Sequence, residues 1–146
     1  MKKLTLAALL STLAFATAAH AAVLSEQNLS MADAQKLATA TVAACQAKGY
    51  NVSASVVDRA GLLKAFARAD NAGPHTIEAS RAKAFTAVSA KTPTLTMMEN
   101  AQKNPGAANL TDIPGFLLLG GGVPVKAGNS VGSPISNPAG TVWGKT

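Results

Sequence analysis

Two alternating segments separated by a short turn constrain the fold of this chain more than any other feature. Residues 50–58, "YNVSASVVD", and residues 62–69, "LLKAFARA", each place small or apolar side chains at every second position. This period of two is typical of half-buried strands. Between them, "DRAG" has the composition of a hairpin turn, with Asp58 opening it and Gly61 accepting a positive φ. Strands joined by so short a turn are antiparallel, so we expect an antiparallel sheet.

Helical patterns lie on both sides of this hairpin. The first begins at Ser30, a predicted N-cap, and ends at Gly49, with small apolar residues three and four positions apart. The second runs from about His75 to Ala90, and a short third helix follows Thr94. Further strands are predicted at "FLLL" and, around the turn "KAGN", in "VPVKAGNSV". The predicted class is α+β: an antiparallel sheet of about five strands with flanking helices in a single compact domain.

The first 21 residues have the organisation of a secretory signal peptide. Two lysines precede an apolar run, and Ala19-His20-Ala21 matches an A-x-A cleavage site. We therefore expect residues 1–21 to be removed and residues 22–146 to form the domain, in the periplasm or outside the cell. The apolar run is short for a membrane span, and no later segment is apolar enough for one, so we predict no span after cleavage.

Charge and cysteine content narrow the function classes. Removing Lys2 and Lys3 from the 13 basic residues leaves 11 against 7 acidic ones, a net charge of +4. The basic residues are scattered and not interleaved with aromatic ones, which argues against nucleic-acid binding and suits a small anionic ligand. Cys45 is the only cysteine, so the chain forms no internal disulfide. Its place on the apolar side of the first helix predicts a small buried residue rather than a reactive thiol.

Several segments occur in an order and at a spacing that together resemble a known protein family. They include the "VVDRAG" hairpin, the "RAKAFTA" helix and the "GGGVPV" segment, within about residues 29–132. This set resembles the GlcG/HbpS family, formerly a domain of unknown function. The resemblance implies a compact domain with an antiparallel sheet and flanking helices, assembly into homo-oligomers, and relatives that include an extracellular haem-binding protein.

The chain departs from the family pattern after about residue 132. Family members usually continue there with a C-terminal helix, whereas this chain reads "SVGSPISNPAGTVWGKT". Pro134 and Pro138 prevent a regular helix, so we expect that helix to be missing. If relatives use that helix to contact a ligand or another subunit, we do not carry those contacts over to this chain.

Four residues at or on the second helix are candidates for a binding site. His75, the only histidine after the signal peptide, is the candidate metal ligand, alone, with a methionine, or in a site shared between subunits. Arg81 falls within the apolar stripe, so we expect it to point inward and hold a ligand carboxylate such as a haem propionate. Lys83 and Thr86 complete the candidate cofactor-binding set.

Each candidate also has an ordinary structural explanation. His75 is equally consistent with a solvated residue at a helix start. Arg81 lies three residues after Glu78 and can form a surface ion pair with it. The Thr86 hydroxyl can bond back to its own helix.

The sequence and the resemblance together predict an exported, non-catalytic protein that binds a small ligand, with haem as the first candidate. Two alternatives stay open. One is an accessory factor or enzyme acting on a small metabolite, with His75, Asp58 or Glu78 as acid or base. The other is an oligomeric structural or interaction protein whose apparent pocket is a subunit interface. No catalytic residue is predicted, and no "GxSxG" nucleophile motif occurs.

Overall fold

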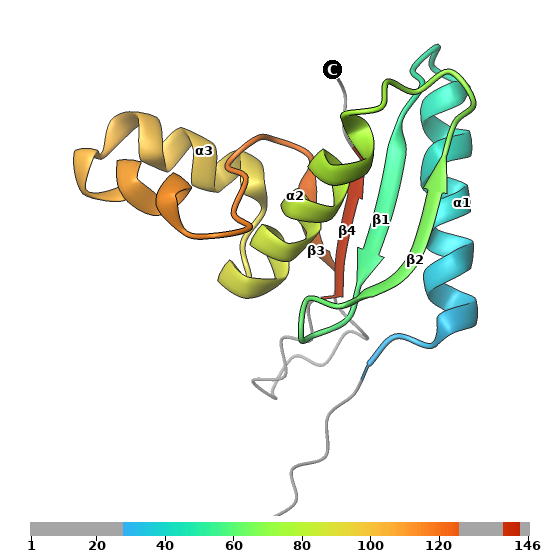
Figure 1. Ribbon diagram of the computed structural model, residues 1–146, viewed down its shortest axis with the longest axis horizontal. Helices are drawn as coiled ribbons and strands as arrows, with labels where there is room; N and C mark the ends of the chain where they lie inside the picture. Colours follow the sequence, from blue (N-terminus) through green and yellow to red (C-terminus); the bar gives the residue numbers. More distant parts are fainter. Residues whose placement is uncertain (1–27, 126–138, 144–146) are drawn as a thin grey trace, which may run out of the picture.

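The protein is built around one sheet with a helix on each face (Figure 1). The structure, a computed structural model, describes residues 28–125 and 139–143. The predicted signal peptide, residues 1–21, lies outside these ranges. The elements are α1 (Met31–Gln46), β1 (Ser53–Val57), β2 (Leu63–Arg68), α2 (Thr76–Ala90), α3 (Thr94–Lys103), the 3-10 helix η1 (Pro105–Asp112), β3 (Gly122–Val125) and β4 (Ala139–Trp143).

The predicted α+β class is confirmed, but the sheet is smaller than expected. Over the described ranges it has four antiparallel strands, in the order β2-β1-β4-β3, where about five were predicted. The hairpin of β1 and β2 forms as predicted. In its turn, one oxygen of the Asp58 carboxylate accepts hydrogen bonds from the N–H groups of Ala60 and Leu62, each 2.9 Å long. Gly61 has the expected positive φ of 79°.

The prediction of a strand at "FLLL", residues 116–119, is wrong. This segment has no ladder partner because its backbone groups bond to side-chain hydroxyls instead. The N–H of Leu117 donates to Thr86 Oγ1 over 2.8 Å, and the carbonyl of Leu119 accepts from Thr94 Oγ1 over 2.8 Å. The apolar run therefore joins α2 and α3 to the sheet as an extended connection.

β3 also has a different partner from the one predicted within "VPVKAGNSV". It pairs with β4, with Val123 opposite Thr141, and β4 lies between β1 and β3. The rest of that predicted hairpin, together with Pro134 and Pro138, lies outside the described residues. The sequence analysis missed β4, although the β-branched and aromatic residues of "TVW" favour a strand.

α1 packs on one face of the sheet across β1 and β2 (Figure 1). Its predicted N-cap is confirmed, since Ser30 Oγ accepts a hydrogen bond from the Asp33 N–H over 3.1 Å. Four residues of the predicted stripe are buried in an apolar cluster, while Leu37 and Thr41 are half-buried. That cluster comprises Ala34, Ala38, Val42, Cys45, Val52, Ala54, Val56, Ala65, Ala69 and Ala72.

Cys45 is one of these buried residues, as predicted. Burial raises the pKa of its thiol, although the nearby Lys48 acts in the opposite direction. The thiol is therefore protonated and inert at neutral pH, since the thiolate is the reactive form.

α2 packs on the opposite face of the sheet, across β1, β4 and β3. It begins one residue later than predicted, and the His75 side chain makes no capping hydrogen bond. In the ranges that the structure describes, no helix is both long enough and apolar enough to cross a membrane.

Candidate functional site

α2 brings the four predicted site residues onto different sides of one helix. Its sheet-facing side is polar to an unusual degree. Ser53 Oγ on β1 lies 2.7 Å from Thr76 Oγ1, and Ser55 Oγ lies 2.7 Å from Ser80 Oγ. We call these four hydroxyl residues, together with Lys83 on the same helix, the buried polar layer.

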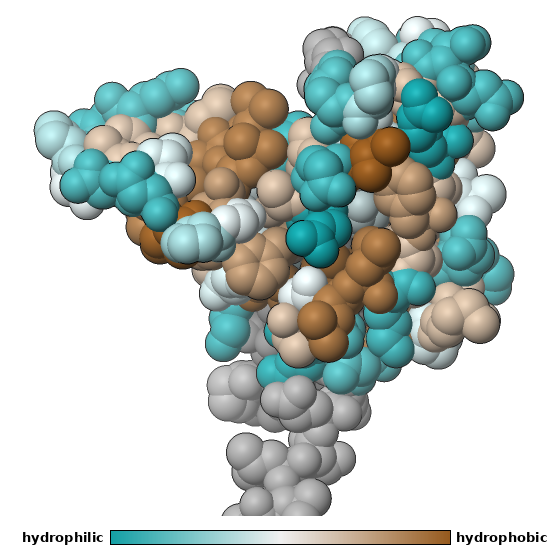
Figure 2. Space-filling view, viewed as in Figure 1, coloured by the Kyte–Doolittle hydropathy of each residue, from teal (hydrophilic) through white to brown (hydrophobic). Residues whose placement is uncertain are grey.

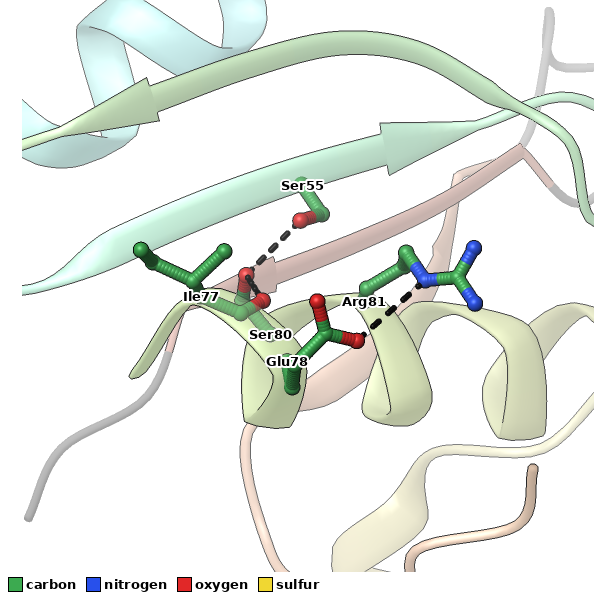
Figure 3. A network of polar contacts seen from close by, with 5 residues as sticks. All are labelled: Ser55, Ile77, Glu78, Ser80 and Arg81. Atoms are coloured by element: carbon green, nitrogen blue, oxygen red, sulfur yellow. Dashed lines mark hydrogen bonds and ion pairs between the residues drawn. The ribbon is translucent and has the colours of Figure 1, made fainter. Parts of the chain in front are cut away.

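The direction of the hydrogen bonds in this layer follows from the carbonyl groups nearby. Thr76 Oγ1 donates to the Gly73 carbonyl over 2.6 Å, and Ser80 Oγ donates to the Ile77 carbonyl over 3.0 Å. A hydroxyl has only one hydrogen to donate. Ser53 and Ser55 are therefore the donors of the two bonds between β1 and α2, and Figure 3 shows the second of them.

Lys83, a predicted cofactor-binding residue, lies inside the protein. Its side chain is only 1% exposed, and it is the largest fully buried side chain among the described residues. Desolvation by burial lowers the pKa of its amine. No hydrogen bond or ion pair joins the amine to another group in the parts of the chain that the structure describes.

Thr86, the second buried candidate, has a structural role. Its Oγ1 donates to the Ala82 carbonyl over 2.8 Å, the bond to its own helix that was kept open as an alternative. The same oxygen accepts from the N–H of Leu117 over 2.8 Å. The second bond joins α2 to the connection before β3, and the two bonds together use the hydroxyl as both donor and acceptor.

The prediction that Arg81 points inward is wrong. Its side chain is 63% exposed, and its Nε lies 3.6 Å from Oε2 of Glu78, whose side chain is 82% exposed. In Figure 3 the Arg81 and Glu78 side chains turn toward each other, while Ser80 points to Ser55. The alternative of a surface pair with Glu78 is therefore what the structure contains.

The physical reason for this error lies in the polar layer. The sequence analysis took Ile77, Ala84 and Val88 as the buried stripe, with Arg81 among them. Ala84 and Val88 are buried, but Ile77 is 41% exposed, because Thr76 and Ser80 take the sheet-facing positions in the first half of the helix.

Arg81 nevertheless borders a pocket, which we call the Phe85 pocket. It lies between the β1–β2 turn at residues 60–62, one side of α2, and residues 114–115, and its volume is about 380 Å³. This is at the lower end of the usual range for ligand pockets, about 300–1,000 Å³. Figure 2 shows hydrophobic residues gathered on this face of the molecule near the hairpin, and Leu62 in the turn is 65% exposed.

Two glycines shape this pocket around the Phe85 ring. A Cβ at Gly61 would lie 2.6 Å from Cδ2 of Phe85, and one at Gly115 would lie 3.3 Å from Cδ1. Both glycines have a positive φ, of 79° and 83°. The ring also packs edge-on against Phe116, with centroids 6.1 Å apart. Phe85 therefore forms a fixed aromatic wall that sequence analysis did not identify as functional.

His75 opens onto a different hollow. That hollow has a volume of about 290 Å³ and is lined by polar residues that include Tyr50, Asn51 and Asn71. It shares no residue with the Phe85 pocket. Within the described ranges, no three His, Cys, Asp or Glu residues form a group that could hold a metal ion.

Comparison with known proteins identifies the relatives of this chain. A search of the curated proteins returned no match. A double mutant of Streptomyces reticuli HbpS is 36% identical, with 88% of this chain and 85% of that chain covered and a TM-score of 0.73. Klebsiella pneumoniae ORFY is 25% identical, with 86% and 83% covered and a TM-score of 0.72.

A third solved structure, a complex of PduOC with haem, is also similar. It is 25% identical, with 80% of this chain and 81% of that chain covered and a TM-score of 0.64. The family model described as "Haem degrading protein HbpS-like" matches residues 29–135. The resemblance drawn from the sequence is thus confirmed, and the chain belongs to the HbpS-like family.

Proposed function

We propose that this chain is an exported, non-catalytic protein that binds haem in the Phe85 pocket. The family and the haem complex of PduOC support a haem-related ligand. The observation that carries the proposal is the pocket itself, which combines an aromatic wall, an exposed leucine and a guanidinium group at its edge.

The contacts available in this pocket suit an amphipathic anion with a flat ring. Phe85 and Leu62 offer apolar surface to the ring. Arg81 meets Glu78 through Nε, and no other partner of its guanidinium occurs among the described residues. Its two terminal nitrogens can therefore donate to a carboxylate, a geometry in which arginine binds well.

The same pocket supplies no customary ligand for the iron. Haem iron is usually held by His, Cys, Met or Tyr, and none of these lines the Phe85 pocket. The residues thus offer apolar surface to the porphyrin ring and one contact to a propionate. His75 lines a separate hollow, so it stays the predicted metal ligand in a site shared between subunits. Carboxylate binding by Arg81 and iron binding by His75 therefore need separate variants.

Titration of the mature chain with hemin tests the proposal. We expect a saturable shift of the Soret absorbance band. Arg81→Gln should weaken the affinity about tenfold, because a hydrogen bond to a charged group contributes about 1.5–3 kcal/mol. Lys103→Gln removes a positive charge from the exposed end of α3 and is the matched control. The absence of a saturable shift in the wild type would contradict haem binding.

Two further measurements separate the parts of the proposal. His75→Ala should change the position of the Soret band if His75 ligates the iron, and an unchanged spectrum would contradict only that assignment. A Soret band that persists in the presence of a reductant and oxygen would support binding rather than the haem degradation named in the family description. The intact mass of exported protein tests cleavage after Ala21.

A further inference from the structure

The Lys83 amine is a buried group that neither the fold nor the proposed site explains. The side chain is 1% exposed, and no partner for it occurs among the described residues. A buried ionisable group without a partner favours its uncharged form, since the charged form loses its hydration. Desolvation lowers the pKa of the amine accordingly.

No charged side chain from the surrounding elements faces this amine. On α2, Glu78 and Arg81 lie on the exposed side and pair with each other. The strands that α2 covers, β1, β3 and β4, contain no ionisable side chain in their sequences. On α3, which meets α2 near its end, Glu99 and Lys103 are exposed. Among the described residues, burial is therefore what lowers the pKa of the Lys83 amine.

α2 is attached to the sheet by a partly polar surface. Buried there are Ser53, Ser55, Thr76, Ser80 and Lys83, beside apolar residues that include Val57, Ala84, Ala87 and Val88. Lifting of α2 from the sheet exposes these hydroxyls and the Lys83 amine to water, which can hydrogen-bond to them and so offsets part of the cost of opening.

We propose that Lys83 links the seating of α2 on the sheet to proton concentration. The amine is uncharged while α2 is seated, and it takes up a proton when α2 lifts and water reaches it. Because the open state binds one more proton than the seated state, falling pH favours opening. The effect begins below the ordinary pKa of a lysine and ends at the lowered pKa of the seated state.

This opening regulates the Phe85 pocket, a consequence that rests on the proposed function. Phe85 and Arg81 belong to α2, whereas Leu62 and Gly115 belong to other segments. When α2 lifts, these walls separate, so a ligand held between them is retained at higher pH and released at lower pH.

Hydrogen–deuterium exchange of the ligand-free mature chain tests the proposal between about pH 6 and pH 9. Exchange rates are divided by the intrinsic chemical rates, and peptides from α1 and α2 are compared. We expect the opening of α2 to increase up to about tenfold for each unit of falling pH until the lowered pKa is reached, with no such change in α1. Lys83→Met and Lys83→Leu should both abolish this dependence.

Two control variants complete the experiment. Lys103→Met, at an exposed lysine, and His75→Asn, beside the first turn of α2, should keep the pH dependence of the wild type. The same dependence in both Lys83 variants would overturn the proposal. Since no haem is present, failure of the hemin titration would not alter this result, so the two proposals are tested separately.

Discussion

The two faces of the sheet are built from different chemistry. Under α1, ten small apolar residues are buried without a polar side chain among them. Under α2, β1 presents Ser53 and Ser55, which bond to hydroxyls of the helix, and Lys83 is buried beside them. The face under α1 has the composition of an ordinary core, whereas the face under α2 has a polar layer that is costly to bury.

This difference indicates a division of roles within the domain. Apolar burial provides most of the stability of a fold, so α1 and the hairpin form its stable part. Arg81 and Phe85 lie on α2 in the wall of the ligand pocket, beside the β1–β2 turn. The helix that carries the site is therefore the one with a polar layer between it and the sheet.

The largest expected effect comes from placing a charge in the α1 face. Ala38 is 0% exposed and has only apolar neighbours in its cluster. Ala38→Asp should lower the free energy of unfolding by more than about 4 kcal/mol, because the carboxylate has no partner there. Urea denaturation followed by circular dichroism measures the loss.

Ala40 provides the matched control for this substitution. It lies on the same helix but is exposed, so Ala40→Asp should change the stability by no more than about 0.5 kcal/mol. Equal losses in the two variants would mean that the cost comes from the helix and not from the apolar face.

The second effect concerns the charge already present under α2. Lys83→Met keeps the length of the side chain and removes the amine, and it should raise the free energy of unfolding by about 1–3 kcal/mol at neutral pH. Burial lowers the pKa of Lys83 in the folded state, so the unfolded chain binds the extra proton and wild-type stability falls as pH decreases. The stability gained by Lys83→Met should therefore become smaller as the pH rises toward the ordinary pKa of lysine.

Denaturation of both proteins at a series of pH values measures this difference. Below the ordinary lysine pKa, the gain should grow by up to about 1.4 kcal/mol for each unit of falling pH, until the lowered pKa is reached. A constant difference between the two proteins at all pH values would show that the buried amine does not change its charge on unfolding.

The contrast also explains which parts of the fold were predictable. α1 has a regular stripe of small apolar residues between Ser30 and Gly49, and its cap and buried side were predicted correctly. For α2, the polar residues Thr76, Ser80 and Lys83 are buried together with Ala84 and Val88. Periodicity of apolar residues cannot locate a buried face that is polar, so Arg81 was placed on the wrong side.

The site was less predictable because it depends on distant segments. The Phe85 pocket joins the hairpin turn, α2 and residues 114–115, which no local pattern brings together. The positive φ at Gly61 was expected from the turn, but its contact with Phe85 was not. β4 lies next to β1, far away in sequence, and pairing at such separation leaves no signal in a single chain.

The smallest expected effect concerns the hydroxyl bonds that replace apolar packing under α2. A double-mutant cycle of Ser55→Ala and Ser80→Ala measures the coupling between these residues, whose oxygens lie 2.7 Å apart. We expect a coupling of about 1 kcal/mol, since a buried hydrogen bond has this net value. Ser80→Ala leaves the Ser55 hydroxyl without this acceptor, whereas in Ser55→Ala the Ser80 hydroxyl keeps its bond to the Ile77 carbonyl. The exposed pair Gln35 and Thr39 on α1, 3.5 Å apart, is the control and should couple by less than about 0.5 kcal/mol. Equal coupling in both pairs would show that the bond between Ser55 and Ser80 holds α2 no more strongly than a solvated contact does.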